Sequence, residues 1–160
     1  MKKVSFIVFI LLHVQIVGQV NNSMHSYPKG YFQSPMDIPL ILSGTFAELR
    51  GNHFHAGLDI KTNQREGLHV FAAAEGYVSR IKISHWGYGK AIYITHPNGY
   101  TTVYAHLQKF NGKIQQYIKK QQYKKESFEI QVFPEAGVLP VKKGELIAFS
   151  GSTGGFVGPH

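Results

Sequence analysis

Glycine constrains this chain more than any other residue, because 17 glycines divide it into short segments with alternating apolar and polar side chains. Between Leu68 and Ile83 apolar residues recur near every second position on both sides of Gly76. This alternation is typical of strands, and a glycine inside it indicates a bend or a close backbone approach. From Pro39 onward the pattern therefore predicts short antiparallel strands with sharp corners.

Residues 91–96 and 100–107 are rich in β-forming side chains and meet at Pro97-Asn98-Gly99, which predicts a hairpin. Residues 145–150 predict another strand that runs into the glycine-rich loop 151–158. Lys113–Ser127 differs, because Ile114 and Ile118 have helical spacing among Gln, Lys and Tyr. The expected fold class is mainly β: an antiparallel sheet or two-layer β-sandwich-like domain with one inserted surface helix.

The N-terminus has a basic start at Lys2 and Lys3, followed by a short apolar segment, Val4–Leu12. About 20 apolar residues are needed to span a membrane, so no stable span is expected. The pattern predicts a signal peptide over residues 1–19, with a buried N-terminal helix as the alternative. We expect an arm or linker at 20–38, a domain at 39–160, and export to the periplasm, cell envelope or extracellular space.

The charge and cysteine content exclude several function classes. The chain has 17 Lys and Arg against 9 Asp and Glu, a formal net charge of +8, and no cysteine. Without cysteine there is no disulfide, thiolate nucleophile or Cys-type zinc finger. Lys109–Lys125 holds six lysines and no arginine, whereas nucleic-acid readers also use arginine, so no nucleic-acid partner is expected. The lysines fit a solvated helix face or a contact with wall polymer.

His55 and Asp59 form a His-x-x-x-Asp pattern that could bind a metal. In a straight strand their Cα atoms would lie about 13 Å apart, at roughly 3.3 Å per residue. Both side chains could then not reach one ion, so the backbone must curl, and Gly57 between them permits this. His53 is two residues from His55, and we interpret it as a structural or supporting residue.

Two more histidines follow in glycine-rich or strand settings. His106 stands in Tyr104-Ala105-His106-Leu107, at the end of the predicted hairpin, and His160 follows Gly158-Pro159. In isolation a histidine at a strand end is more often structural, and a terminal one carries little weight. Imidazole is nevertheless a metal ligand and a proton carrier near neutral pH, so the histidines gain meaning when taken with His55 and Asp59.

Taken in this order, the motifs resemble the lysostaphin/LytM-like zinc metallopeptidase family, of the peptidoglycan DD-/endopeptidase type. Its members have a His-x-x-x-Asp motif in a glycine setting, then Tyr-Ala-His-Leu, then Gly-Pro-His-Leu-His. The resemblance runs from about residue 43 to residue 160. It includes further glycine and strand phrases: Gly67–Ala73, Gly76–Val78, Gly87–Gly89 and Val141–Ile147.

The resemblance implies a role for each matching residue. His55 and Asp59 match the first two Zn2+ ligands, and His106 matches a catalytic histidine beside the metal. His160 matches the first, catalytic histidine of the last motif. The second histidine of that motif, the third zinc ligand, would fall two positions further on. We therefore expect the C-terminal end of the domain to be missing and this chain alone to be inactive.

The implied function is zinc-dependent hydrolysis of peptide bonds in the stem or cross-bridge peptides of peptidoglycan. The oligomeric state stays open. Two other interpretations also stay open: a non-catalytic wall-binding or regulatory module of the same fold, and a purely structural β-module. The chain has no Gly-x-Ser-x-Gly elbow and no phosphate-binding glycine motif, so other enzyme classes find little support.

Overall fold

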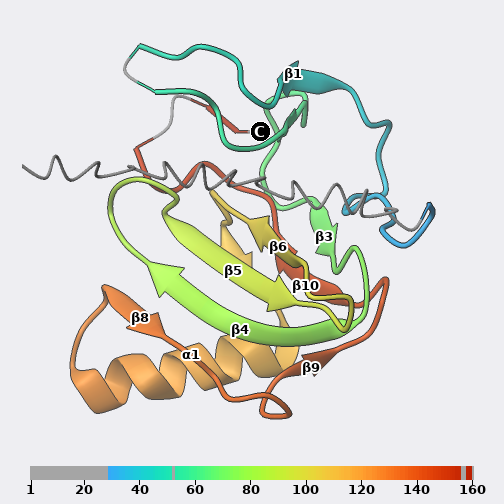
Figure 1. The fold of residues 1–160 in the computed structure, drawn as a ribbon. Coiled ribbons are helices and arrows are strands. Elements are labelled where there is room, and N and C mark those ends of the chain that lie inside the picture. The colour runs from blue at the N-terminus through green and yellow to red at the C-terminus, as the bar shows by residue number, and fades with distance from the viewer. Residues whose placement is uncertain (1–28, 52, 156–157, 160) are drawn as a thin grey trace, which may run out of the picture.

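The computed structural model describes residues 29–51, 53–155 and 158–159, and in this part the chain is mainly antiparallel β with a single helix (Figure 1). The largest sheet has the strand order β6-β5-β4-β8, with β9 paired to the start of β4. Its strands are β4 (Gly76–Ile83), β5 (Lys90–Thr95), β6 (Thr101–Tyr104), β8 (Ile130–Val132) and β9 (Pro140–Val141). Every pairing in it is antiparallel.

Two smaller sheets complete the fold. One has the order β3-β10-β7, built from β3 (His69–Phe71), β7 (Lys109–Phe110) and β10 (Leu146–Phe149). The other is the pair β1 (Leu42–Gly44) and β2 (Asp59–Ile60). The predicted fold class, antiparallel β with one helix, is confirmed.

The core lies between the two larger sheets and the helix. Strands β4 and β5 each contribute fully buried side chains, among them Val78, Ile81 and Ile92, which pack with Ile147 of β10; the period of two is interrupted by a register shift between Val78 and Arg80. One face of each strand is therefore apolar, as the alternating sequence predicts. Gly76 begins β4 and is no bend within a longer strand. A Cβ there would overlap the carbonyl oxygen of Thr95 on β5, so glycine allows the two backbones to approach.

The predicted helix is present as α1 (Gly112–Lys125). Ile114 and Ile118, four residues apart, are its buried side chains and belong to the core. The helix ends at Lys125 and is capped by Glu126, whose backbone is left-handed and whose N–H donates to the carbonyls of Gln122 and Tyr123. The end therefore comes two residues before the predicted Ser127.

The predicted hairpin joins β5 to β6, with Gly99 in a left-handed conformation at its turn. Strand β6, however, ends at Tyr104, whereas the sequence predicted a strand through Leu107. The physical reason is His106, whose φ of 55° lies outside the range of strands. His106 consequently lies on a turn of the chain and not on a strand.

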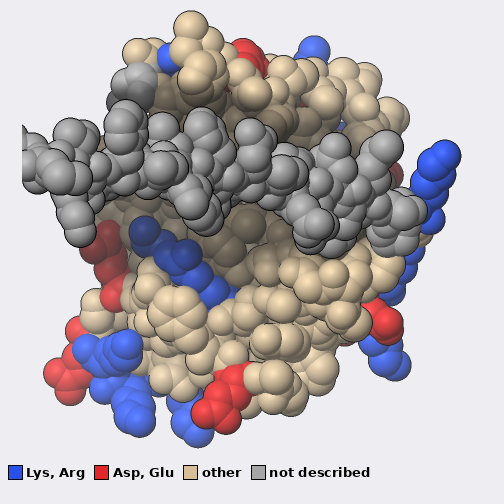
Figure 2. Space-filling view, in the orientation of Figure 1, with Lys and Arg blue, Asp and Glu red and all other residues tan. Residues whose placement is uncertain are grey.

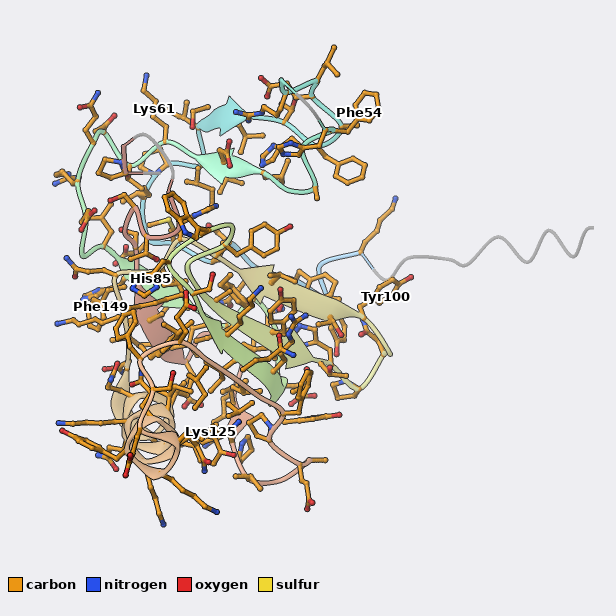
Figure 3. The ribbon with its side chains drawn as sticks, turned by 90° about the vertical axis from the view of Figure 1, so that its left-hand side faces the viewer. Phe54, Lys61, His85, Tyr100, Lys125 and Phe149 are labelled. Carbon is orange, nitrogen blue, oxygen red and sulfur yellow. The ribbon has the colours of Figure 1, made fainter. Side chains whose placement is uncertain are left out.

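We call residues 42–60, with β1 and β2, the hairpin lobe, and the remaining strands with α1 the body. Figures 1 and 3 show the hairpin lobe at one end of the molecule and α1 at the opposite end. In Figure 2 the hairpin lobe is largely uncharged, while Lys and Arg side chains gather over the lower part of the body. The lobe exposes several large apolar side chains: Leu42, Phe46, Leu49, Phe54 and Leu58.

The start of the described chain packs on the body. The N–H of Gln33 donates to Ala73 O, the N–H of Phe71 donates to Pro35 O, and Met36 is buried. The predicted signal peptide, residues 1–19, lies outside the described residues. Within the described part, no helix is long and apolar enough to cross a membrane.

Candidate metal centre

The structure brings His55 and Asp59 together in the hairpin lobe. His55 Nε2 lies 3.1 Å from Asp59 Oδ1, so the backbone between them is curled, as the metal-binding prediction required. The bend falls at Gly57, but the backbone of Gly57 is not left-handed. A Cβ on Gly57 would lie 3.8 Å from His55 Nε2. Glycine therefore does not supply an unusual conformation here, and a Cβ would make only an ordinary contact with Nε2.

The carbonyl of Thr45 fixes the orientation of the His55 ring. His55 Nδ1 lies 2.9 Å from Thr45 O, and a carbonyl can only accept, so Nδ1 carries the proton and donates it. In the neutral ring Nε2 then presents its lone pair to the carboxylate of Asp59. Two acceptor atoms 3.1 Å apart repel each other unless a proton or a cation lies between them.

Arg50 holds the other oxygen of the Asp59 carboxylate, a contact that the sequence motifs do not reveal. Arg50 Nη2 lies 2.8 Å from Asp59 Oδ2 and 3.4 Å from Glu48 Oε2. With Oδ2 taken by Arg50, Oδ1 is the oxygen directed at His55. A Cβ at Gly44 would overlap both Asp59 Oδ2 and Arg50 Nη2, so β1 needs glycine at this point.

The pair fits a zinc ion. Ligands at about 2.0–2.1 Å in a tetrahedron have donor atoms roughly 3.3 Å apart, close to the separation of His55 Nε2 and Asp59 Oδ1. Hydrogen bonds from the outer atoms of both groups, Nδ1 to Thr45 and Oδ2 to Arg50, resemble the supporting contacts that orient metal ligands. His55 and Asp59 would therefore hold the ion through Nε2 and Oδ1.

No third ligand joins them within the described residues, where no group of three or more His, Asp or Glu side chains could hold a metal. His53 does not complete such a group, and its carbonyl accepts the N–H of Arg50 at 2.9 Å. His160 lies outside the described residues. The roles predicted for His160 and for a histidine beyond it stay predictions.

His106 belongs to the body and is held by the glycine-rich loop. His106 Nδ1 lies 2.8 Å from Thr153 O, so Nδ1 carries the proton and Nε2 is the nitrogen that can accept one. The ring of Tyr88 meets the imidazole edge to face at 6.1 Å, and Tyr88 O accepts the N–H of His106. The sequence indicated His106, but neither Thr153 nor Tyr88.

Thr153 itself is fixed by two further hydrogen bonds. Its hydroxyl accepts the N–H of Lys90 on β5 at 3.0 Å and donates to Leu107 O at 2.9 Å. Ser152 Oγ in addition donates to Glu66. The loop 151–155 is thus attached to the body at several points, and the tautomer of His106 follows from that attachment.

A second histidine of the body, His96, is structural. It is buried, and its Nδ1 and Nε2 bond Glu75 O and Thr102 Oγ1 at 2.7 and 2.9 Å. Thr102 bonds the hydroxyl of Tyr104, which also accepts the N–H of Ala73. Burial raises the pKa of Tyr104, while its bonds with Thr102 and Ala73 oppose that rise.

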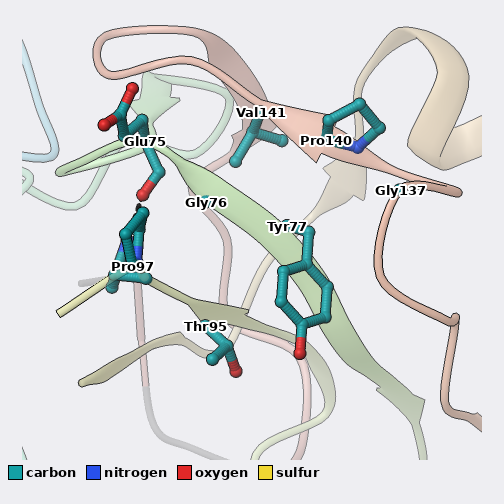
Figure 4. A pocket seen from close by; sticks show the side chains of 9 residues that line it. Glu75, Gly76, Tyr77, Thr95, Pro97, Gly137, Pro140 and Val141 are labelled. Atoms are coloured by element: carbon teal, nitrogen blue, oxygen red, sulfur yellow. Dashed lines mark hydrogen bonds between the residues drawn. The ribbon is translucent and has the colours of Figure 1, made fainter. Parts of the chain in front are cut away.

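Beside His96 lies a hollow of about 490 Å³ between β4, β5 and β9 (Figure 4). Its lining includes Tyr77, Pro97 and Pro140, and the three predicted site residues that the structure describes, His55, Asp59 and His106, do not line it. The hollow therefore supplies no alternative to the pair formed by His55 and Asp59.

Comparisons with known proteins agree with the geometry. Residues 53–123, which include His55, Asp59 and His106, match the model of Peptidase family M23. The chain is 30% identical over 146 residues to an uncharacterized metalloprotease of Haemophilus influenzae, covering 88% of this chain and 26% of that protein. It is 34% identical over 106 residues to the DD-carboxypeptidase/endopeptidase Mpg of Neisseria meningitidis, covering 66% and 18%.

A third relative is the glycyl-glycine endopeptidase ALE-1 of Staphylococcus capitis, 29% identical over 92% of this chain and 32% of that protein. The chain thus spans at most about a third of the length of these relatives. Among solved structures, a mutant catalytic domain of the M23 protein EnpA from Enterococcus faecalis has the same fold, with a TM-score of 0.53 and 20% identity over 76% of this chain and 75% of that one. Residues 53–123 of this chain thus match Peptidase family M23, and the fold of the EnpA domain agrees with that match.

Proposed function

We propose that this chain is the metallopeptidase domain of an exported, zinc-dependent endopeptidase that hydrolyses peptide bonds in the stem or cross-bridge peptides of peptidoglycan. The observation that carries the proposal is the His55–Asp59 pair, with Nε2 and Oδ1 directed at each other 3.1 Å apart. The peptidoglycan substrate is inferred from the names of the Neisseria and Staphylococcus relatives. Nucleic acid is not a proposed partner.

Each residue has a part that follows from its contacts. His55 and Asp59 would hold zinc through Nε2 and Oδ1, with Thr45 and Arg50 keeping these atoms in place. Bound zinc supplies a water with its pKa lowered toward about 7 and polarises the scissile carbonyl. Thr153 keeps the proton of His106 on Nδ1, so Nε2 can accept a proton during the reaction.

His160 is the second proposed catalytic histidine, with a role in stabilising the oxyanion or passing a proton to the leaving amine. The third metal ligand is the histidine expected two positions beyond it. Both assignments come from the resemblance to the family, and the contacts of the described residues neither support nor oppose them.

The experiment replaces Asp59 by alanine in the natural protein, produced as its gene encodes it. We expect zinc content, measured by mass spectrometry, and release of amines from purified peptidoglycan to be lost together. The matched control is Asp37→Ala, because the carboxylate of Asp37 is exposed and lies beside His69, with Oδ2 3.6 Å from His69 Nδ1. Unchanged zinc content and hydrolysis in Asp59→Ala would contradict the proposal.

The same assay separates the enzyme from a non-catalytic module. A wild-type protein that binds zinc and sediments with peptidoglycan but releases no amines would favour the wall-binding interpretation. Loss of hydrolysis in His106→Ala, with zinc content retained, would support catalysis, because His106 is proposed to act beside the metal and not to bind it.

A further inference from the structure

Trp86 is the only tryptophan of the chain, and 75% of its surface is exposed. It belongs to the loop Ser84–Gly89 between β4 and β5, which we call the Trp loop. A large aromatic side chain on the surface of a folded domain is informative when the backbone that carries it is fixed, since binding then costs little ordering.

The Trp loop is fixed by hydrogen bonds within itself. Ser84 Oγ donates to Trp86 O and accepts the N–H of Trp86 at 3.2 Å, while the N–H of Ser84 donates to Gly89 O at 3.1 Å. The N–H and the Nδ1 of His85 both lie 2.7 Å from Glu129 Oε1, which joins the loop to the segment before β8. The backbone position from which the indole projects is therefore set before any ligand arrives.

The edge of the indole lies over glycine. A Cβ at Gly155 would come within 3.0 Å of Cε3 and 3.3 Å of Cζ3 of Trp86, so Gly155 is against the ring. Gly154 is equally close to the Trp loop, because a Cβ on it would overlap the carbonyl of Gly87. Among the described residues, the exposed indole and the glycine backbone at 154–155 therefore lie side by side and offer an aromatic face next to backbone polar groups.

Two segments connect this surface to the candidate catalytic residue His106. Gly155 is two residues from Thr153, whose carbonyl accepts from His106 Nδ1. Tyr88 is two residues from Trp86 and packs its ring against His106. Two residues of extended chain span only about 7 Å between Cα atoms, so the backbone that carries Trp86 lies near the residues that hold His106.

We propose that Trp86 and Gly154–Gly155 bind a sugar ring of the glycan strand that carries the substrate peptide, a proposal that rests on the proposed function. The apolar C–H face of a pyranose stacks on an aromatic ring, and glycine backbone groups can bond its hydroxyl and acetamido groups. A charged peptide would instead need a counter-charge. The ionisable groups of the Trp loop and its anchor, His85 and Glu129, are paired with each other.

The experiment uses the single tryptophan of the 160-residue chain as a fluorescent reporter. The chain is titrated with a linear β-1,4-linked tetramer of N-acetylglucosamine and, separately, with a free stem peptide that carries no sugar. The expected result is a saturable blue shift of the Trp86 emission with the tetramer and none with the peptide. A shift with the peptide alone would overturn the proposal.

Binding of the tetramer is then followed in variants by saturation-transfer NMR. Trp86→Ala should weaken binding at least tenfold, while Trp86→Phe, which keeps a flat ring, should retain part of it. The control is Phe54→Ala, because Phe54 is also exposed but lies on the hairpin lobe, away from His85 in Figure 3. Equal binding by Trp86→Ala and wild type would overturn the proposal.

These outcomes are independent of hydrolysis. A wild-type protein that binds the tetramer through Trp86 but cleaves no peptidoglycan would refute the proposed function and support the sugar site. A protein that cleaves peptidoglycan, but whose binding of the tetramer is unaffected by Trp86→Ala, would support the proposed function and refute the sugar site.

Discussion

The hairpin lobe and the body each hold one part of the candidate site, and they do so by different forces. In the lobe, His55 and Asp59 are positioned by polar contacts with Thr45 and Arg50, while the apolar side chains around them point to solvent. In the body, His106 is held by a loop attached to strands whose apolar side chains are fully buried.

Because the two regions are held by different forces, substitutions in the lobe and in the body should change different measured properties. Removing a polar contact in the lobe should disturb the metal ligands but hardly change the free energy of unfolding, because little apolar surface is buried there. Removing an apolar contact in the body should destabilise the whole domain. Predictions about stability and about metal binding therefore belong to different residues.

The largest effect on stability is expected from Ile118→Ala in α1. Ile118 is fully buried in the core, and truncation of such a side chain costs about 2–5 kcal/mol of unfolding free energy. In the lobe, Leu49→Ala should cost about 0.5 kcal/mol or less, because Leu49 is 74% exposed. Urea unfolding followed by circular dichroism measures both. Equal losses would mean that the lobe has a core of its own.

The next effect concerns the buried hydroxyl of Tyr104. Tyr104→Phe leaves the N–H of Ala73 without its partner, which costs about 1–3 kcal/mol of unfolding free energy at neutral pH. Because burial raises the pKa of Tyr104 in the folded chain, its neutral hydroxyl stabilises the fold below the ordinary pKa of 10.0. That contribution is lost as the pH rises above 10.0 through the raised value.

The advantage of wild type over Tyr104→Phe should therefore shrink in alkaline solution, as measured by urea unfolding from pH 7 to about 11. The exposed Tyr123→Phe is the control and should show no such difference. If the advantage of wild type stays constant up to the highest pH, the pKa of Tyr104 is the same in the folded and the unfolded chain, and the prediction is wrong.

Gly44→Ala tests whether a change in the lobe weakens metal binding without lowering stability. The added Cβ would overlap Asp59 Oδ2 and Arg50 Nη2 and so displace the contact that orients the carboxylate. We expect the natural protein to bind zinc about 10- to 100-fold more weakly, the usual loss when a supporting contact of a ligand is removed. Isothermal titration with Zn2+ measures this, and the unfolding midpoint should stay nearly constant.

The control for this substitution is Gly51→Ala, since no atom lies within 4 Å of a Cβ at Gly51. If Gly44→Ala and Gly51→Ala bind zinc equally well, Arg50 does not orient Asp59. If Gly44→Ala unfolds at much lower urea, the lobe contributes more to stability than the exposed apolar side chains indicate.

Local patterns predicted most of the body and half of the lobe. The alternation along β4 and β5, the turn at Gly99 and the buried Ile114 and Ile118 are consequences of periods that a sequence displays directly. The His55–Asp59 pair was predicted from its motif and from the family resemblance, because on a straight strand the same spacing would keep the two side chains apart. The end of β6 could not be predicted, because nothing in Tyr104-Ala105-His106-Leu107 requires a left-handed backbone at His106.

The residues that support the site were hidden for another reason. Arg50 reaches Asp59 across a turn of nine residues, and Thr153 reaches His106 across 47. Such contacts depend on how separate segments pack, and a single sequence holds no periodic signal for them. Trp86 was likewise inconspicuous until the contacts of the Trp loop were known.

The smallest effect is expected in the Trp loop, where an exposed ion pair between His85 and Glu129 joins the loop to the segment before β8. The N–H of His85, and then its ring, lower the pKa of Glu129, with a smaller contribution from Lys82. The attachment is therefore complete above the ordinary pKa of 4.5 and is lost as the pH falls through the lowered value. The anisotropy of Trp86 fluorescence should fall over that acid range while the circular dichroism of the domain is retained. Glu129→Gln should show the lower anisotropy already at neutral pH, whereas the control Glu135→Gln, at an exposed position, should not.

If the anisotropy of Trp86 is the same in wild type and in both variants, the hydrogen bonds of Ser84 suffice to hold the Trp loop.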